Sequence, residues 1–147
     1  MGVESFWNEF VVGVALFAVQ QSLYQMCTND ATLLALVTGV FDATPENQPF
    51  PYIVIGEGTE VPWNTFGRRG RQTTVTNHVW SQATTNGEAS AIIARMNVLL
   101  HRKVLGAMAG YENVLCLYDM SQVFPDADGL SIHGIVRYRL LSQEGTP

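Results

Sequence analysis

The chain has 147 residues, of which 47% are apolar and only 14% are charged, and its formal net charge is −5. This length suits one domain that buries roughly two-thirds of the surface of its unfolded chain. So few charges on a small domain favour a surface partly covered by other subunits over an unusually large core. The acidic balance argues against nucleic acid as the main ligand, because phosphate binding needs an excess of Lys and Arg.

Two cysteines, Cys27 and Cys116, lie in no CxxC or Cys/His cluster, which argues against structural zinc. A single disulfide stays open, but apolar neighbours favour buried, reduced thiols and synthesis inside a cell. The apolar run 10–19 is too short to span a membrane and lacks the flanking features of a signal peptide. The sequence therefore predicts no membrane partner.

The first third of the chain has helical periodicity. Its apolar residues recur at helical spacing at Leu16, Val19, Leu23 and Met26. Residues 1–13 precede this pattern as an N-terminal extension or arm, and residues 14–147 are expected to form a single domain. Polar residues at 28–30 offer a cap for a short second helix over 31–37.

From residue 49 the pattern changes to strands. Segments 51–56 and 71–81 read as two strands, and the glycines and proline of 57–70 predict a loop or long hairpin tip between them. Segments 112–123 and 130–142 read as two more, joined by a turn at 124–129. In the last strand one face is predicted to carry Ile132, Gly134, Val136, Tyr138 and Leu140, and the other Ser131, His133, Arg137 and Arg139.

The strongest helical pattern lies between these two pairs of strands. Thr85 and Glu88 have the spacing of a capping box. One apolar stripe follows, made of Ala89, Ile92, Ile93, Met96, Leu99 and Leu100. Two hairpins separated by a helix predict an α+β fold, in which a four-stranded, mainly antiparallel sheet has helices packed on one face. The other, half-polar face is left for a partner.

No pattern in the sequence predicts catalysis, a cofactor or a metal. Asp126 and Asp128 resemble the start of a calcium loop, but the later ligands do not follow, so a hairpin turn is expected. His78, His101 and His133 lie in different elements, where isolated histidines are more often surface or interface residues than ligands. Since the nucleophile elbow of hydrolases is also missing, the chain is predicted not to be an enzyme.

The sharpest charge feature is the basic segment 67–71. It reads Gly-Arg-Arg-Gly-Arg, with Arg68, Arg69 and Arg71 as its arginines. Trp63 and Phe66 lie just upstream. The segment predicts a mobile basic tip that contacts a phosphate or an acidic neighbouring subunit, and aromatic side chains beside Arg are typical of such an interface patch. Two alternatives stay open: a solvated hairpin tip, and a groove that stacks single-stranded nucleic acid.

Three stretches, taken together, carry a resemblance. The first is Val-Phe-Asp-Ala-Thr-Pro at 40–45, which runs into Phe-Pro-Tyr-Ile-Val-Ile-Gly-Glu at 50–57. The second is His-Val-Trp-Ser at 78–81, followed by Gly-Glu-Ala at 87–89 and a helix ending in Leu-Leu-His at 99–101. The third is Asp-Gly-Leu-Ser-Ile-His-Gly-Ile-Val-Arg-Tyr-Arg at 128–139. In order and spacing they resemble the tail completion, or tail terminator, family of long-tailed phages over residues 15–143.

The resemblance implies a structural virion protein of the tail, made in the host cytoplasm and located at the head–tail junction. Members of this family, which also occur in gene transfer agents, form rings, typically hexamers, that stop polymerisation of the tail tube. The implied partners are further copies of the chain in a homohexameric ring, the tail tube protein and a head-side connector or stopper protein. Double-stranded DNA would pass through the channel without specific binding.

A terminator needs two unlike faces, one that docks on the last tube ring and one that offers no template for further growth. We therefore expect interface residues in the loop 57–71 and the turn 124–129, namely Trp63, Phe66, Arg68, Arg69, Arg71, Phe124, Asp126 and Asp128. The alternative function is a small nucleic-acid-binding module that uses the basic-aromatic loop 57–71. A small enzyme would be favoured only by His and carboxylate groups that converge in a pocket.

Overall fold

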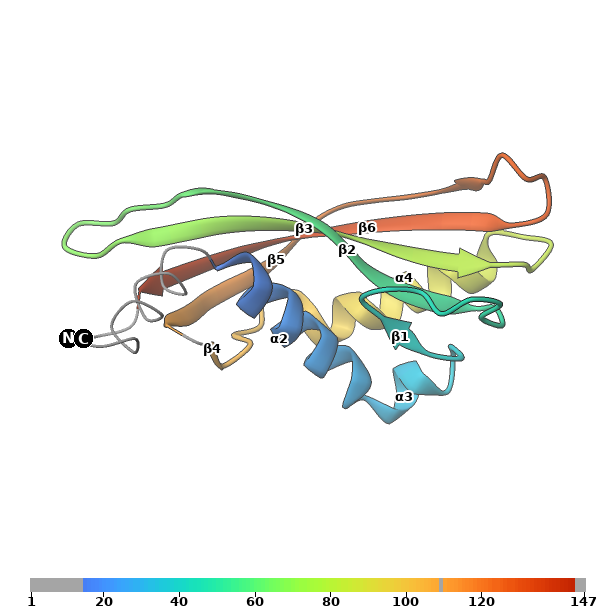
Figure 1. Cartoon of the computed structure of the whole chain (residues 1–147), viewed down its shortest axis with the longest axis horizontal. Helices are drawn as coiled ribbons and strands as arrows, with labels where there is room; N and C mark the ends of the chain where they lie inside the picture. The colour runs from blue at the N-terminus through green and yellow to red at the C-terminus, as the bar shows by residue number, and fades with distance from the viewer. Residues whose placement is uncertain (1–14, 109, 145–147) are drawn as a thin grey trace.

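A curled sheet with helices on one face makes up the fold (Figure 1). The computed structural model describes residues 15–108 and 110–144, so the predicted arm at 1–13 lies outside the described residues. The elements run in the order α2 (Leu16–Thr28), α3 (Ala31–Leu34), β1 (Val40–Phe41), β2 (Tyr52–Pro62), β3 (Gly70–Ser81), α4 (Gly87–Leu100), β4 (Ala107–Met108), β5 (Tyr111–Pro125) and β6 (Ile132–Glu144).

The α+β class is confirmed, but the predicted four-stranded sheet is wrong in its strand number. The sheet of the described residues has six strands in the order β1-β2-β3-β6-β5-β4. The four long strands are the predicted ones and pair antiparallel. The additional strands β1 and β4 each have two residues, and β1 pairs in parallel with β2. Strands this short show no periodicity, so a sequence pattern does not reveal them.

The β2–β3 hairpin is longer than predicted. Residues 57–62, expected in a loop, continue β2, and β3 begins at Gly70. Glycines in this segment weakened the strand pattern. The pairing of β2 with β3 shifts register there, between Ile55 and Gly58, and then continues. A Cβ on Gly56 would lie 2.2 Å from the Thr76 carbonyl oxygen, so the backbones approach here as only glycine allows. Of the two predicted alternatives for 57–70, a loop or a long hairpin tip, the structure has the hairpin, which projects as a two-stranded arm.

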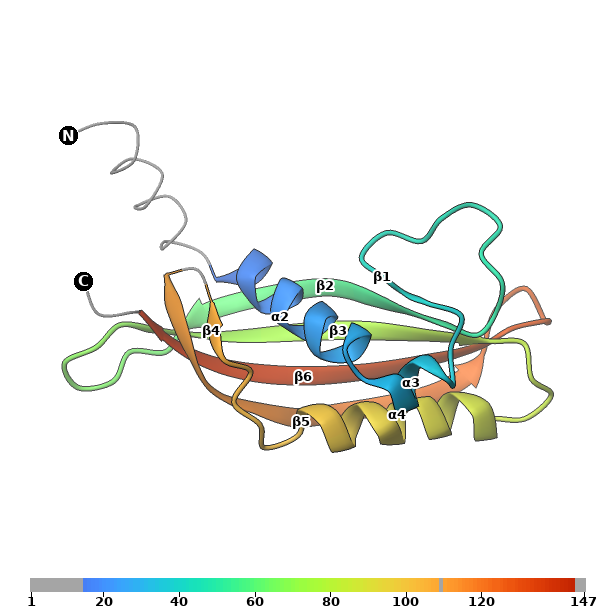
Figure 2. The same cartoon turned by 90° about the horizontal axis from the view of Figure 1, so that it is seen from below.

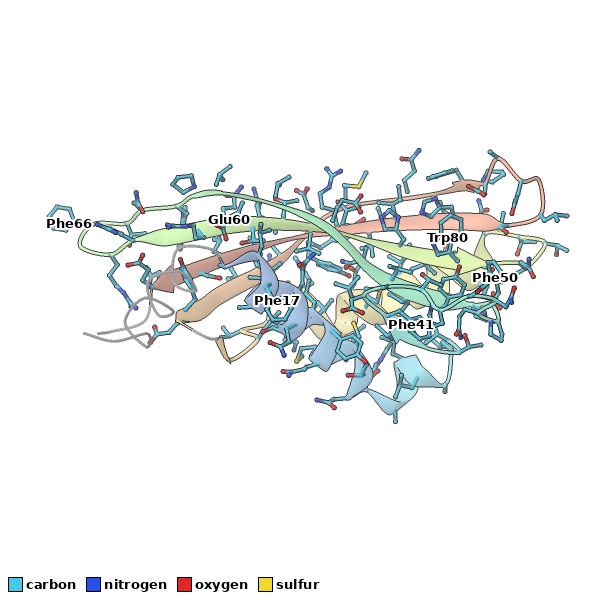
Figure 3. The ribbon with its side chains drawn as sticks, viewed as in Figure 1. Phe17, Phe41, Phe50, Glu60, Phe66 and Trp80 are labelled. Carbon is cyan, nitrogen blue, oxygen red and sulfur yellow. The ribbon has the colours of Figure 1, made fainter. Side chains whose placement is uncertain are left out.

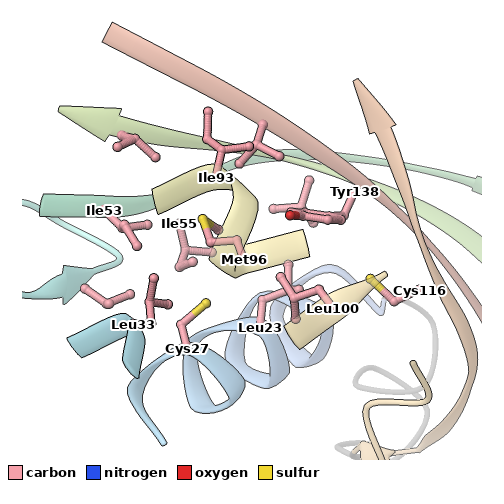
Figure 4. Close-up of a cluster of buried hydrophobic side chains, with 14 of the residues drawn as sticks. Leu23, Cys27, Leu33, Ile53, Ile55, Ile93, Met96, Leu100, Cys116 and Tyr138 are labelled. Carbon is pink, nitrogen blue, oxygen red and sulfur yellow. The ribbon is translucent and has the colours of Figure 1, made fainter. Parts of the chain in front are cut away.

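The helices bury the predicted apolar stripes against the concave side of the sheet (Figures 2 and 4). Helix α2 packs on β2, and α4 packs on β3, β5 and β6. The buried side chains of α2 are Val19, Leu23 and Cys27, and those of α4 are Ala89, Ile92, Ile93, Met96 and Leu100. Both predicted helical stripes are thus confirmed. On β6, Gly134 lets α4 come close, because a Cβ there would meet Ile93 and Val79 at 3.3 and 3.4 Å.

Two details of the helix ends differ from the predictions. The capping box at α4 does not form: the Glu88 carboxylate accepts a hydrogen bond from the Ser81 hydroxyl at 2.7 Å instead. Helix α3 ends at Leu34, well before residue 37, although the predicted cap is present. The Asp30 carboxylate accepts from the Leu33 amide at 2.8 Å and also binds Arg95 of α4. Tertiary partners therefore decide which polar side chains cap these helices.

Both cysteines are buried and unpaired, as favoured by their apolar neighbours. Burial raises the pKa of Cys27 and of Cys116 to about 12. Thiols with such pKa values are protonated at neutral pH and react slowly with alkylating reagents. No helix within residues 15–108 and 110–144 is long and apolar enough to cross a bilayer.

The convex face of the sheet is uncovered by helices (Figure 1). Along β3, burial alternates, so that Thr74, Thr76, His78 and Trp80 are the half-buried residues of this face. Along β6 the predicted alternation is confirmed, with Gly134, Val136, Tyr138 and Leu140 buried and with His133, Arg137 and Arg139 on the open face. Ser131, also predicted on the open face, is buried in the turn before β6 begins. This face carries cationic and aromatic groups, whereas the opposite face holds the core.

Candidate functional site

The eight predicted interface residues separate into two groups at opposite ends of the sheet. The β2–β3 tip carries Trp63, Phe66, Arg68, Arg69 and Arg71, and the β5–β6 turn carries Phe124, Asp126 and Asp128. The register fixes this arrangement, since Gly70 pairs with Gln143 at one end of β6 and Ser81 pairs with Ile132 at the other. The structure does not bring the two groups together within one subunit.

The tip is a tight turn that presents one aromatic side chain. Thr65 and Arg68 exchange two backbone hydrogen bonds of 3.0 and 3.1 Å around Phe66 and Gly67. Gly67 has a φ of 87°, a conformation that favours glycine. Phe66 at the apex is fully exposed, at the extreme of the molecule's long axis (Figure 3). An exposed aromatic side chain close to arginines is typical of an interface patch.

The end of β6 braces this tip. The Arg69 carbonyl accepts a hydrogen bond from the Glu144 amide at 2.9 Å. The Arg68 guanidinium donates to the Glu144 carbonyl oxygen and lies 3.3 Å from the Glu112 carboxylate. Gln143 donates to the Thr65 hydroxyl at 3.1 Å. The basic segment is therefore a built hairpin rather than an irregular loop, and Phe66 is held in a fixed direction.

The three arginines of the tip differ in their surroundings. Arg68 is paired with Glu112, and Arg71 lies 3.7 Å from the Glu60 carboxylate in a half-buried pair. Arg69 is exposed, and within the part of the chain that the structure describes it has no carboxylate partner. Of the predicted basic cluster, Arg69 is thus the cation left for an external group.

The opposite end is the predicted hairpin turn, and Asp128 organises it. The Asp128 carboxylate accepts from the Leu130 and Ser131 amides and from the Ser131 hydroxyl, each at 2.8 Å. These donors, with the Leu130 amide as the main cause, lower the pKa of Asp128. Leu130 beside it is 75% exposed. The Asp128 side chain stabilises the turn, so its negative charge is partly neutralised within the subunit.

The open sheet face brings together two histidines that sequence reasoning treated as separate. His78 Nδ1 lies 2.8 Å from His133 Nε2, and His78 Nε2 lies 2.9 Å from a Glu57 carboxylate oxygen. Trp80 stacks on the His133 ring with 3.9 Å between centroids. Burial, followed by the charge of His78, lowers the pKa of His133, and the His78 hydrogen bond lowers the pKa of Glu57. Among the described residues, no three His, Cys, Asp or Glu side chains are grouped so as to hold a metal ion.

A groove of about 620 Å³ lies between α2 and the edge of the sheet, and sequence reasoning missed it. Gln20 donates to the Gly56 carbonyl oxygen at 2.7 Å and so fixes α2 against β2 at the groove wall. Its lining combines exposed aromatic side chains with acids, namely Phe17, Gln20, Gln21, Tyr24, Asp42, Val54, Ile55, Gly56, Glu57 and His78. Only the placement of α2 on β2 joins these segments, so no local motif could have revealed the groove.

The groove and the hairpin tip carry complementary chemical groups. The groove holds two carboxylates and one imidazole, of which Glu57 and His78 are bonded to one another. Its aromatic rings and carboxylates can bind an apolar side chain next to a cation. The tip offers this combination in Phe66 and Arg69. The arrangement is therefore suited to protein–protein contacts.

Comparison with known proteins agrees with this geometry. Residues 21–143 match the family model described as tail completion protein gp17. Tail completion protein gp17 of Bacillus phage SPP1 is 31% identical over 122 residues, covering 83% of this chain and 90% of the relative. The solved structure of SPP1 gp17 is similar with a TM-score of 0.57 and 28% identity, over 84% of this chain and 87% of that one.

A chain in the virion of a native gene transfer agent particle has the same fold. Its TM-score is 0.77 at 23% identity, with 87% of this chain and 96% of that chain covered. The match of the family model, which extends from α2 to the end of β6, and the identity to SPP1 gp17 are the stronger evidence. The chain belongs to the tail completion protein gp17 family, whose members are structural components of the virion tail.

Proposed function

We propose that this tail component forms a homohexameric ring that caps the head-proximal end of the tail tube, stops polymerisation of the tube and joins the tail to a head-side connector or stopper. The ring acts at the head–tail junction after synthesis in the host cytoplasm. Its partners are the tail tube protein, the connector and further copies of the chain. Double-stranded DNA passes through the channel without specific binding.

The two unlike ends of the sheet support a capping role. One end projects a braced hairpin with a fully exposed Phe66, and the other is a short turn whose Asp128 is satisfied internally. A subunit with unlike ends can contact a different neighbour through each of them, as a cap between the tube and the head requires. A net charge of −5 also suits a channel that must release the passing duplex.

The single observation that carries the proposal is the exposed Phe66 on a rigid, basic tip. Phe66→Ser and Arg69→Ala remove the two outward groups without touching the bonds of Arg68 and Arg71. We expect each variant to fold but to leave tails uncapped, visible in electron micrographs as over-long tails and headless particles. A matched control is Val98→Ser on α4, where the apolar side chain is 60% exposed and away from the tip. Normal tails and full infectivity in both tip variants would contradict a role for the tip.

The same assay tests whether Arg68, Arg69 and Arg71 act as one functional cluster. Because Arg68 and Arg71 pair with Glu112 and Glu60, their replacement by Ala should weaken the hairpin as well as any external contact. Arg69→Ala alone should change assembly but not the thermal stability of the subunit. An equal loss of stability in all three variants would assign Arg69 a role within the subunit instead.

Exposed Phe66 beside Arg69 also favours a second candidate function, a small nucleic-acid-binding module that uses residues 57–71. Proteins that bind single-stranded nucleic acid stack its bases on aromatic side chains and contact its phosphates through nearby cations. Only one of the tip arginines lacks a carboxylate partner among the described residues, which leaves little charge for phosphates. A salt-sensitive mobility shift with short single-stranded DNA would support this function, and no binding at low salt would remove it.

A further inference from the structure

We infer that the hairpin tip of one subunit docks in the groove between α2 and β2 of a second copy of the same chain. Phe66 would pack against Phe17 and Tyr24, and the Arg69 guanidinium would pair with the Asp42 carboxylate. This inference deepens the proposed ring by naming the two surfaces that hold it together, and it rests on that proposed function.

The groove is a preformed surface that carries two exposed aromatic side chains. Phe17 is 73% exposed and Tyr24 is 39% exposed, although both belong to a helix whose other face fills the core. The hydrogen bond from Gln20 to the Gly56 carbonyl oxygen fixes the distance between helix and strand. A site that needs no rearrangement loses little free energy on ordering, which favours docking of a similarly rigid partner.

The charges of the groove and the tip are complementary. Among the described residues, the groove is lined by the Asp42 and Glu57 carboxylates and by no Arg or Lys. Glu57 is held by His78, whereas Asp42 is exposed and forms no ion pair within the part of the chain that the structure describes. At the tip, Arg69 is the cation without such a partner. One exposed acid and one exposed base, each beside exposed aromatic groups, therefore match across two copies.

The contact cannot be made within one subunit, because β2 carries its own tip away from its own groove. The strand leaves the groove at Glu57 and runs extended to Pro62 before the tip begins. With a rise of about 3.3 Å per residue, Ile55 and Pro62 are about 20 Å apart. Figure 3 shows Phe66 at one extreme of the long axis and Phe17 well inside it, under the sheet. The tip is thus presented to a neighbour.

Docking of this kind joins two different patches of the same molecule. When each subunit offers its tip to one neighbour and its groove to the next, a closed ring forms if the rotation between copies closes. Two subunits that each dock their tip in the groove of the other would form a two-fold dimer by the same contact. The inference therefore agrees with a cyclic assembly, and the mass of the assembly distinguishes a ring from a dimer.

Site-directed cross-linking tests the contact directly. Two populations of full-length chain are co-assembled, one with Tyr24→Cys and the other with one substitution to cysteine at the position under test. The mixture is then treated with a short bismaleimide. The native Cys27 and Cys116 are buried, with pKa values of about 12, so wild-type chains serve as the unreactive control. We expect a covalent dimer when the second variant is Phe66→Cys.

The competing occupants of the groove are the β5–β6 turn and residues 1–14 of another copy. They are tested by Leu130→Cys and Phe6→Cys as the second variant in the same reaction. A dimer with either of these but not with Phe66→Cys overturns the inference. So does an assembled ring, verified by native mass spectrometry, that yields no Phe66–Tyr24 dimer.

A charge exchange tests the proposed ion pair. Arg69→Asp should raise the protein concentration needed for assembly by about tenfold or more, because two acids then face each other. Addition of Asp42→Arg in the same chain should restore assembly, whereas Asp42→Arg alone should impair it. The matched charge control is Lys103→Glu. Lys103 lies beside β5, which is separated from β2 by strands β3 and β6. Failure of the double variant to recover, with both chains folded, would exclude this pairing.

These experiments separate the inference from the proposed function. Particles whose tails are capped normally but which give no Phe66–Tyr24 dimer would refute the docking and leave the capping role standing. A Phe66–Tyr24 dimer in rings that fail to limit tail length would support the docking and refute the capping role.

Discussion

The imidazoles of His78 and His133 meet on the open face of the sheet, with 2.8 Å between Nδ1 and Nε2. Strands β3 and β6 place them diagonally, since His78 pairs in register with Ile135 and His133 with Trp80. Glu57 binds the far nitrogen of His78, and Trp80 and Phe124 contact the His133 ring. A hydrogen bond between the rings needs a proton on only one of the two facing nitrogens, while the other accepts it.

This pair predicts a pH dependence of stability. The pKa of His133 in the folded chain is lowered below 6.5, by burial and by His78, against smaller opposing effects of Asp126 and Glu57. The unfolded chain therefore binds the proton first as pH falls, and stability present above pH 6.5 is lost below it. The free energy of unfolding, measured by urea titration between about pH 7.5 and about pH 5.5, should fall in the wild type and fall less in His133→Gln. Parallel pH profiles for the two proteins would contradict this assignment.

The helix-to-sheet core predicts a large effect at Met96. Its side chain is fully buried on α4, toward the core (Figure 4). Met96→Ala removes apolar contacts and leaves a cavity, so the free energy of unfolding should fall by about 2–5 kcal/mol. Val98→Ala, two residues along the same helix but 60% exposed, should change it by about 0.5 kcal/mol or less. Similar losses at both positions would show that α4 does not pack in this orientation.

The bond between Asp30 and Arg95 predicts a graded response. Asp30 caps α3 and also accepts two hydrogen bonds from Arg95 at 2.8 and 2.9 Å. Asp30→Asn keeps an acceptor for the cap but removes the charge, and Asp30→Ala removes both. The melting temperature at neutral pH should therefore decrease in the order wild type, Asp30→Asn, Asp30→Ala.

Acid pH supplies the control for this series. The Arg95 hydrogen bond lowers the pKa of Asp30 from 3.8, so its contribution is present above pH 3.8 and is lost as pH falls through the lower, folded-state value. The difference between wild type and Asp30→Asn should shrink in that acidic range. A difference that stays constant on acidification would exclude the ion pair as its origin.

The base of the projecting hairpin predicts a sharp steric effect at Gly70. A Cβ there would lie 2.1 Å from the Trp63 carbonyl oxygen and 2.7 Å from the Ser142 carbonyl oxygen. Gly70→Ala should destabilise the subunit by about 1–3 kcal/mol and increase hydrogen exchange of the tip amides. The control is Gly87→Ala, where the nearest atom lies 3.5 Å away and a helix begins. Unchanged exchange at the tip in Gly70→Ala would contradict the hairpin geometry.

Periodic elements with one buried face were the predictable part of this fold. The stripe of α4 and the alternation of β6 follow from burial alone, and both appear as predicted. The capping box failed because Glu88 found a tertiary partner in Ser81, which local spacing does not encode. Residues 57–70 stayed open between a loop and a long hairpin tip because Gly56 and Gly58 weaken strand propensity, while in the structure the neighbouring strand stabilises the hairpin.

The candidate site was only half predictable. Aromatic and basic residues close together in sequence marked the tip, and Phe66 and Arg69 are indeed the exposed members of that group. Nothing local distinguishes them from Arg68 and Arg71, which are paired with acids from other strands. The groove and the histidine pair depend on which segments lie side by side, so they follow from topology and register rather than from any motif.

The ends of the described chain meet the projecting hairpin. The Ala15 amide donates to the Glu60 carboxylate at 2.7 Å, and the Glu144 amide donates to the Arg69 carbonyl. A small tag inserted directly after Glu144 would thus leave the subunit beside the tip, far from the β5–β6 turn. Gold particles bound to such a tag would reveal in micrographs which end of the subunit faces the capsid. The same proximity makes a bulky insertion after Glu144 a poor choice for expression, since it would crowd Phe66 and Arg69.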